Sequence, residues 1–131
     1  MRIDRVETTL YRIALEEPVK MAGKPLLADY DMVVVEIGTS DGATGWGYTG
    51  VHSGHGAAVA ALAAEPFTAH LLGEDPRHIE ALWHAMWKSA YYSGRGGSAG
   101  FALAAVDTAL WDLRAKSLGE PLWRLLGGHD P

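Results

Sequence analysis

The chain has 131 residues, of which 48% are hydrophobic and 21% are charged, the composition of an ordinary globular domain. Its net charge of −5 argues against nucleic acid as a partner, and the absence of cysteine excludes disulfides and thiolate metal sites. Charges near the start argue against a signal peptide, and no segment reaches the ~18 apolar residues of a membrane span. We therefore expect a cytoplasmic protein with no nucleic-acid or membrane partner.

The first third of the chain predicts β structure. Residues 3–15 alternate as a strand does, and the apolar phase changes near residue 10, which predicts a bulge or bend there. Pro18 is expected to end this strand. Residues 17–30 show no periodicity, and an irregular connection of that length is usually functional or disordered.

Two further strands follow this connection. Residues 31–39 form the clearest strand of the sequence, and Asp41-Gly42 supplies a turn into a strand at 44–49. Gly45 and Gly47 leave one side of the last strand as bare backbone, where another element could pack closely. The three strands are expected to form an antiparallel meander.

The rest of the chain predicts helices. A glycine-rich loop at 50–56 precedes an alanine-rich helix at 57–64, which Pro66 interrupts and Gly73 closes. Asp75-Pro76 then resembles the start of a helix, with a capping residue followed by proline at the first helical position.

An amphipathic helix is expected next, ending at the break formed by residues 94–97. Its apolar residues recur at helical spacing: Ile79, Leu82, Trp83, Met86, Trp87, Ala90 and Tyr91. The break formally matches a dinucleotide-binding fingerprint, G-x-G-x-x-A, but a helix precedes these glycines where nucleotide binding needs a strand. A helix–helix turn is therefore the better interpretation.

The central helix is predicted at 98–118, with Ser98 as its cap, Gly119 as a left-handed end and Pro121 as a stop. One further helical turn is expected at 121–126. Apolar residues cover almost every face of the central helix, which places it in the middle of the protein. Strands followed by helices predict the α+β class: a three-stranded antiparallel meander followed by a helical bundle.

Two carboxylates interrupt the apolar surface of this helix. Asp107 lies within the apolar run, and burying a lone charge costs several kcal/mol or more. We expect Asp107 to pair with Arg114, two turns on, and Asp112 to pair with Lys116 at i,i+4. Structural ion pairs are the simpler interpretation, and a functional role is the alternative.

His52 and His55 are the most suggestive polar pair in the loops. Their spacing would suit a metal on a helix, but a glycine-rich loop fixes no such geometry and no third ligand lies nearby. Loop side chains that face a pocket are the better interpretation. By its own chemistry the sequence contains no complete active site.

Several motifs together resemble a known family. They are the run AVDTALWDLRAK at 105–116, Gly119, Pro121-Leu122, LLGG at 125–128, LGEDP at 72–76 with Leu82-Trp83, and Asp41-Gly42 with Gly45-Trp46-Gly47. This pattern resembles the mandelate racemase/muconate lactonizing enzyme branch of the enolase superfamily along essentially the whole chain. The element Gly94-Arg95-Gly96-Gly97 is most similar to the acid-sugar dehydratases of that branch.

The resemblance implies a two-part enzyme. Residues 1–125 would form an N-terminal capping domain (enolase N-terminal domain-like), and residues 126–131 would begin the connection to a C-terminal TIM-type barrel that lies outside this sequence. In such enzymes the barrel binds Mg²⁺ and carries the base that removes the proton α to a carboxylate. The fragment alone would be inactive, and the full-length protein would be a lyase or isomerase: an acid-sugar dehydratase, racemase or cycloisomerase.

In this family two loops of the capping domain close the pocket over a small carboxylate or acid-sugar substrate. By position these loops are residues 17–30 and 50–56. The substrate-binding residues expected from them are Lys20, Lys24, Tyr30, His52, Ser53 and His55. No catalytic residue or metal ligand is expected in this chain. The resemblance also implies a homo-oligomer whose central helix lies against the barrel.

A different class of function fits the same composition. The chain could be a free-standing, non-enzymatic domain that binds another protein, or a second copy of itself, through its tryptophan-rich helices. The two hypotheses differ in what an uncovered central helix would do. A barrel-facing surface would leave the isolated chain with a large exposed apolar patch, and the chain would then self-associate or bind a hydrophobic dye.

Overall fold

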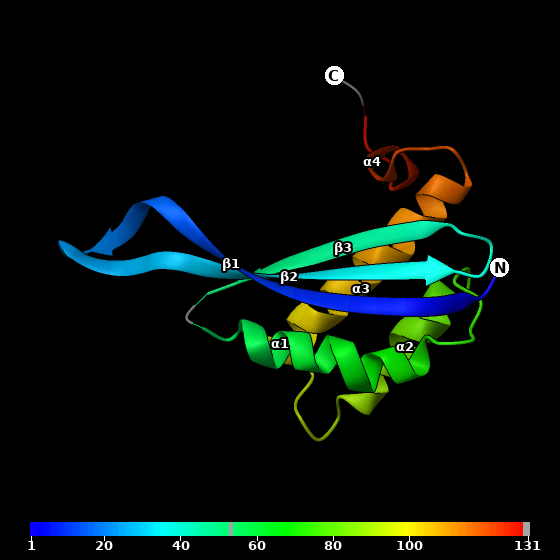
Figure 1. Ribbon diagram of the computed structural model, residues 1–131, viewed down its shortest axis with the longest axis horizontal. Helices are drawn as coiled ribbons and strands as arrows, with labels where there is room; N and C mark the ends of the chain where they lie inside the picture. Colours follow the sequence, from blue (N-terminus) through cyan, green and yellow to red (C-terminus); the bar gives the residue numbers. More distant parts are fainter. Residues whose placement is uncertain (53, 130–131) are drawn as a thin grey trace.

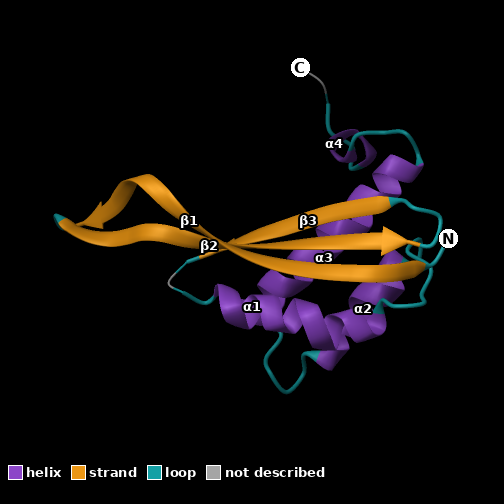
Figure 2. Ribbon diagram, in the orientation of Figure 1, coloured by secondary structure: helices purple, strands orange, loops and turns teal. Residues whose placement is uncertain are grey.

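The computed structural model describes residues 1–52 and 54–129 and shows a three-stranded sheet with helices on one face (Figures 1 and 2). The antiparallel strands β1 (Ile3–Met21), β2 (Lys24–Thr39) and β3 (Thr44–Val51) lie in that order. The α-helices α1 (Gly56–Leu62), α2 (Ile79–Ser89), α3 (Gly97–Ser117) and α4 (Leu122–Leu125) follow. The predicted α+β class and meander are confirmed.

The core lies between the sheet and the helices. Val33, Val35 and Ile37 of β2 point into it and are fully buried, as their alternation predicts. The helices contribute the opposite wall, which includes Val59, Met86, Val106, Ala109, Leu110 and Leu113. The other face of the sheet has no covering helix among the described residues, and Trp46 and Tyr48 are exposed there.

Helix α3 packs unusually close to β3, and the two glycines of this strand permit it. A Cβ on Gly45 would lie 2.7 Å from the Cβ of Leu113, and one on Gly47 would lie 2.5 Å from the backbone nitrogen of Ala109. Side chains of α3 also form hydrogen bonds with backbone groups on the free edge of β3. The Trp46 N–H donates to Asp112 at 2.8 Å, and Lys116 donates to the Thr44 carbonyl at 3.1 Å. The predicted close approach at β3 is therefore confirmed.

The prediction of an irregular connection at residues 17–30 was wrong. β1 continues to Met21 and β2 begins at Lys24, so this stretch is a long β-hairpin that projects from the body (Figure 1). Its tight turn is Ala22-Gly23, where both residues have positive φ. The alanine gave no turn signal, because a positive φ is rare for it.

Pro18 lies inside β1 instead of ending it. The pairing register shifts between Ala14 and Val19, and a proline is tolerated at such an irregularity. The bulge predicted near residue 10 is absent, since Leu10 pairs with Val33 in unbroken register. The apolar residues of β1 change from even to odd positions near residue 10 because the outer face of the sheet also carries large side chains, among them Tyr11.

The helical region differs from prediction at two boundaries. Pro66 does not break the chain, because a π-helical turn (Ala63–Phe67) and a 3₁₀ turn (Thr68–His70) continue α1. Asp75 does not cap α2, which begins at Ile79; its carboxylate accepts a hydrogen bond from the Arg77 N–H at 2.9 Å and holds a turn instead.

The bounds of α3 agree with the prediction to within one residue, but its cap does not. Gly96 is the capping residue, no side chain caps it, and Ser98 lies inside the helix. At the other end Gly119 adopts the predicted left-handed conformation, with a φ of 69°, and the Glu120 N–H donates to the Ala115 carbonyl. The predicted turn at 121–126 is present as α4.

Candidate functional site

The base of the hairpin and the loop after β3 meet at one end of the sheet. β3 ends where Val51 pairs with Asp31, and beyond this point β1 and β2 continue as a two-stranded ribbon. The Tyr30 ring of β2 lies edge-on to the His52 ring of the loop, with 6.5 Å between their centroids. Two of the expected site residues are therefore neighbours.

Two hollows lie beside this contact, and His52 borders both. One, of about 370 Å³, is lined by Val51, His52, His55, Gly97, Ser98 and Phe101. The other, of about 410 Å³, lies against the hairpin and is lined by Val19, Leu26, Leu27 and His52. His52 and His55 thus face a pocket shared with the start of α3, as the sequence suggested.

The two expected lysines lie elsewhere. Lys24 pairs with Met21 next to the hairpin turn, Lys20 is one step away, and both are exposed. Neither lines the hollows beside His52. The structure therefore does not bring them together with the histidines within this chain. Ser53, the remaining expected residue, lies outside the described residues.

An ion pair between exposed Arg12 and buried Asp31 anchors this end of the sheet, and it was not predicted from the sequence. Asp31 is only 2% exposed; its carboxylate accepts hydrogen bonds from Arg12 Nε and from the Gly56 N–H, each at 3.0 Å. The hydrogen bond from the Arg12 guanidinium, helped by the Gly56 N–H, lowers the pKa of Asp31 despite burial. A signal was present, because Asp31 shares the inward phase of Val33 and Val35.

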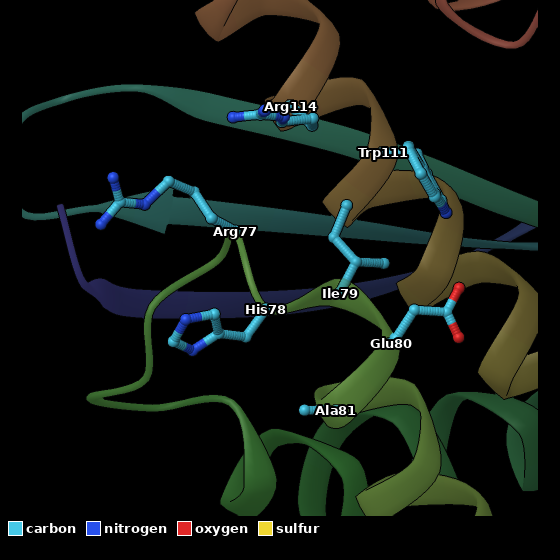
Figure 3. A pocket seen from close by; sticks show the side chains of 7 residues that line it. All are labelled: Arg77, His78, Ile79, Glu80, Ala81, Trp111 and Arg114. Carbon is cyan, nitrogen blue, oxygen red and sulfur yellow. The ribbon is translucent and has the colours of Figure 1, made fainter.

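A larger hollow, of about 560 Å³, lies between α2 and α3. Figure 3 shows Trp111 and Arg114 of α3 across it from Ile79 and Glu80 at the start of α2, with Arg77 and His78 completing the wall. One turn before Trp111, burial raises the pKa of Asp107, and the nearby Glu80 carboxylate raises it further.

The predicted pair between Asp107 and Arg114 is wrong. No ion pair joins them in the described part of the chain, because seven residues of helix separate them by about 10.5 Å along the axis. Asp107 is instead half-buried without a cationic partner among the described side chains. The predicted pair between Asp112 and Lys116 is confirmed, at 2.6 Å.

An apolar stripe runs along α3 to its capping residue and consists of Phe101, Ala104, Trp111 and Leu118, of which Trp111 is half-buried against the core. Phe101 is 45% and Leu118 is 50% exposed, and α4 adds Trp123 at 44%. The tryptophans of α2 are likewise half-buried against the core: Trp83 stacks on Trp87, and Arg95 lies over the Trp87 ring, 3.7 Å from its centroid. At this side of the helices, α3 and α4 therefore leave Phe101, Leu118 and Trp123 uncovered.

The described residues contain no group of three His, Cys, Asp or Glu side chains placed to hold a metal ion. The Mg²⁺ that the family resemblance implies therefore finds no fitting set of ligands among residues 1–52 and 54–129. None of the helices in residues 1–52 and 54–129 is long and apolar enough to cross a membrane.

Comparison with known protein families identifies the family of this domain. Residues 5–127 match the family model "Mandelate racemase / muconate lactonizing enzyme, N-terminal domain". The chain belongs to this family. It is the N-terminal, capping domain of an enolase-superfamily protein, as the sequence motifs indicated.

The chain is similar to enzymes of this family along almost its whole length. It is 45% identical to a 3,6-anhydro-α-L-galactonate cycloisomerase from Streptomyces coelicolor, over 98% of this chain and 36% of that protein. It is 43% identical to a D-galactonate dehydratase from Verminephrobacter eiseniae, over 72% and 24%. The chain thus spans between about a quarter and about a third of the length of the curated relatives it matches.

Solved structures of the family share the fold. A racemase from Streptomyces coelicolor A3(2) with bound magnesium superposes with a TM-score of 0.92 at 45% identity, covering 98% of this chain and 36% of that one. An L-talarate/galactarate dehydratase from Salmonella typhimurium LT2 gives 0.89 at 33% identity, covering 98% and 34%. The relatives of this capping domain are therefore isomerases and acid-sugar lyases.

Proposed function

We propose that this domain closes the active site of a Mg²⁺-dependent enzyme that removes the proton α to the carboxylate of a sugar-derived acid. The proposal rests on the family membership and on relatives that are named as acting on anhydrogalactonate, galactonate and mannonate. The full-length enzyme would be a dehydratase, a racemase or a cycloisomerase, working as a homo-oligomer in the cytoplasm. Residues 1–125 would form the domain, and residues 126–131 would begin its connection to a barrel.

The hairpin and the 52–55 loop would be the parts that meet the substrate. Tyr30, His52 and His55 gather at the junction of these elements and beside the hollow at the start of α3. They offer hydroxyl and imidazole groups, which can donate hydrogen bonds to a carboxylate or to sugar hydroxyls. Shutting them over the pocket would exclude water and strengthen the electrostatic stabilisation of the enolate.

Lys20, Lys24 and Ser53 belong to the same proposal by their position in these two elements. The projecting ribbon would carry the lysines to the substrate only if the hairpin lies over the barrel, because within this chain they do not approach the histidines. The apolar stripe of α3 and its neighbour Trp123 would pack against the barrel. Without the barrel the domain would hold no Mg²⁺ and catalyse no reaction.

The test uses the full-length protein with 3,6-anhydro-L-galactonate, D-galactonate and D-mannonate as substrates. We expect turnover of a sugar acid with added Mg²⁺, and none by the 131-residue chain alone. His52→Asn and Tyr30→Phe should each lower kcat/KM for that acid by about tenfold and change the ranking of the three acids, with Mg²⁺ affinity unchanged. His84→Asn, on exposed α2 surface, is the matched control.

A ranking of substrates that is identical in the wild type and in all loop variants would contradict the proposed role of these residues. Turnover or micromolar Mg²⁺ binding by residues 1–131 alone would contradict the proposal that the barrel binds the metal and catalyses the reaction while this domain closes the site.

A further inference from the structure

Asp31 lies at the point where three parts of the molecule meet. It pairs with Arg12 of β1 across one side of β2 and with Val51, the last residue of β3, across the other. Beyond this position the sheet loses its third strand and only the hairpin continues. A two-stranded ribbon is marginally stable by itself, so its direction depends on what holds its base.

The Asp31 carboxylate also holds the start of α1. One oxygen accepts from Arg12 Nε and the other accepts from the Gly56 N–H, both at 3.0 Å. The residue before this helix, His55, makes no side-chain cap of its own. Backbone N–H groups at a helix start need acceptors from elsewhere, and Asp31 supplies one from a position 25 residues earlier.

The fit between Asp31 and Gly56 leaves no room for a side chain. A Cβ on Gly56 would lie 2.7 Å from Asp31 Oδ2 and 2.7 Å from Leu10 Cδ1. The end of the 52–55 loop therefore packs closely against the base of the hairpin, with the Gly56 backbone against the Asp31 and Leu10 side chains. The neighbouring Tyr30 makes a second contact with the same loop, through its ring and that of His52.

Arg12 supplies the positive charge that compensates the Asp31 carboxylate. Asp31 is 2% exposed, whereas the Arg12 side chain is 62% exposed, so the charge on Asp31 is shielded from water and depends on its partner. Removing one partner of a buried pair leaves an uncompensated charge, which must reorient or take up a proton. Either response weakens the contact with Gly56, although Arg12 itself is bonded to Asp31 and not to the loop.

We propose that Asp31 is a positioning residue that fixes the hairpin and the 52–55 loop relative to each other, so that the two substrate-facing elements behave as one unit. This inference rests on the proposed function of those elements. Asp31 itself is nearly fully buried and would touch no substrate. Its effect on catalysis would be exerted through the side chains of Tyr30, His52 and His55.

The experiment compares Arg12→Gln, Arg12→Lys and Asp31→Asn in the full-length protein. Arg5→Gln is the matched control, because Arg5 also lies on β1 and pairs with a carboxylate of β2, that of Glu36 at 2.6 Å, away from residues 50–58. Amide hydrogen exchange is followed over residues 50–58, and KM and kcat are measured with the sugar acid that the wild type turns over. Arg12→Gln keeps the test informative if Asp31→Asn fails to fold, since Arg12 is largely exposed.

We expect Arg12→Gln and Asp31→Asn to speed exchange over residues 50–58 by about tenfold, with exchange in α3 unchanged. KM should rise by about tenfold with kcat within about twofold. Arg12→Lys should return KM most of the way to the wild-type value, and Arg5→Gln should leave both KM and exchange over residues 50–58 as in the wild type. Exchange over residues 50–58 that is unchanged in Arg12→Gln would overturn the inference, as would a loss of kcat and thermal stability with no change in KM.

Failure of the proposed function would look different. In that case the variants of Tyr30 and His52 would leave the substrate ranking unaltered, whatever the exchange rates of residues 50–58 in the Arg12 variant.

Discussion

Gly47→Ala tests the close packing of α3 on β3. The new Cβ would fall inside the van der Waals distance of the Ala105 carbonyl oxygen and 2.5 Å from the Ala109 nitrogen, where ordinary contacts begin near 3.4 Å. These are backbone atoms of a buried helix, so they cannot rotate away as a flexible side chain could. The whole of α3 would have to move outward, and the Trp46–Asp112 hydrogen bond would lengthen with it.

Overpacking of a core typically costs 1–3 kcal/mol, and a clash with rigid backbone belongs at the upper end, about 3 kcal/mol. For a domain of this size, 1 kcal/mol corresponds to about 4 °C in Tm, so we expect a fall of about 12 °C. Thermal unfolding of the 131-residue chain, followed by circular dichroism, measures it.

Gly50→Ala on the same strand is the matched control. Its Cβ would meet only the Tyr30 ring, at 3.9 Å, and neither glycine has a positive φ that alanine would resist. Gly50→Ala should therefore be neutral or slightly stabilising, because alanine restricts the unfolded chain. If the two variants unfold within about 0.5 kcal/mol of each other, close helix–strand packing is not what these glycines provide.

Two further predictions concern α3. Asp107→Asn should raise the Tm of the chain at pH 7, because a raised folded-state pKa means that the ionised carboxylate destabilises the fold; the gain should shrink as the pH falls through that pKa, and an equal gain at low pH would contradict this origin. The chain should also bind a hydrophobic dye or self-associate through Phe101 and Leu118, and Phe101→Ser with Leu118→Ser should abolish this, whereas Tyr92→Ser, which is 97% exposed on a separate loop, should not. A dye-silent monomeric wild type would refute the second prediction.

Much of the fold follows from patterns that span a few residues. The inward phase of Val33, Val35 and Ile37 is set by alternation along one strand, and Gly119 with Pro121 ends α3 because these residues favour a left-handed turn and forbid continuation. Gly45 and Gly47, on either side of Trp46, indicated that another element packs closely on this strand, and that element is α3. The family was also readable, since its motifs are runs of residue types at fixed spacings.

The parts that were not predicted depend on longer-range contacts. The hairpin at residues 17–30 has little local signal, because its turn begins with Ala22 and its strands contain Pro18. Asp75 matched the pattern of a helix cap, yet it stabilises a turn with Arg77 that delays α2. Arg114 was predicted to pair with Asp107 because it lies on the same face of α3. It lies too far away, because seven residues at about 1.5 Å each separate the two along the helix axis.

Local patterns along the chain therefore define the strand order, the central helix and the family. The family resemblance also marks residues 17–30 and 50–56 as the segments that we propose contact the substrate. Tertiary structure decided which residues of those segments meet. Asp31 contacts Arg12 and Gly56 across 19 and 25 residues of chain, and these contacts exist only because the register of β1 on β2, and the end of β3, bring the three together. Periodicity and turn chemistry act over a few residues, whereas strand register is set by the packing of the whole sheet.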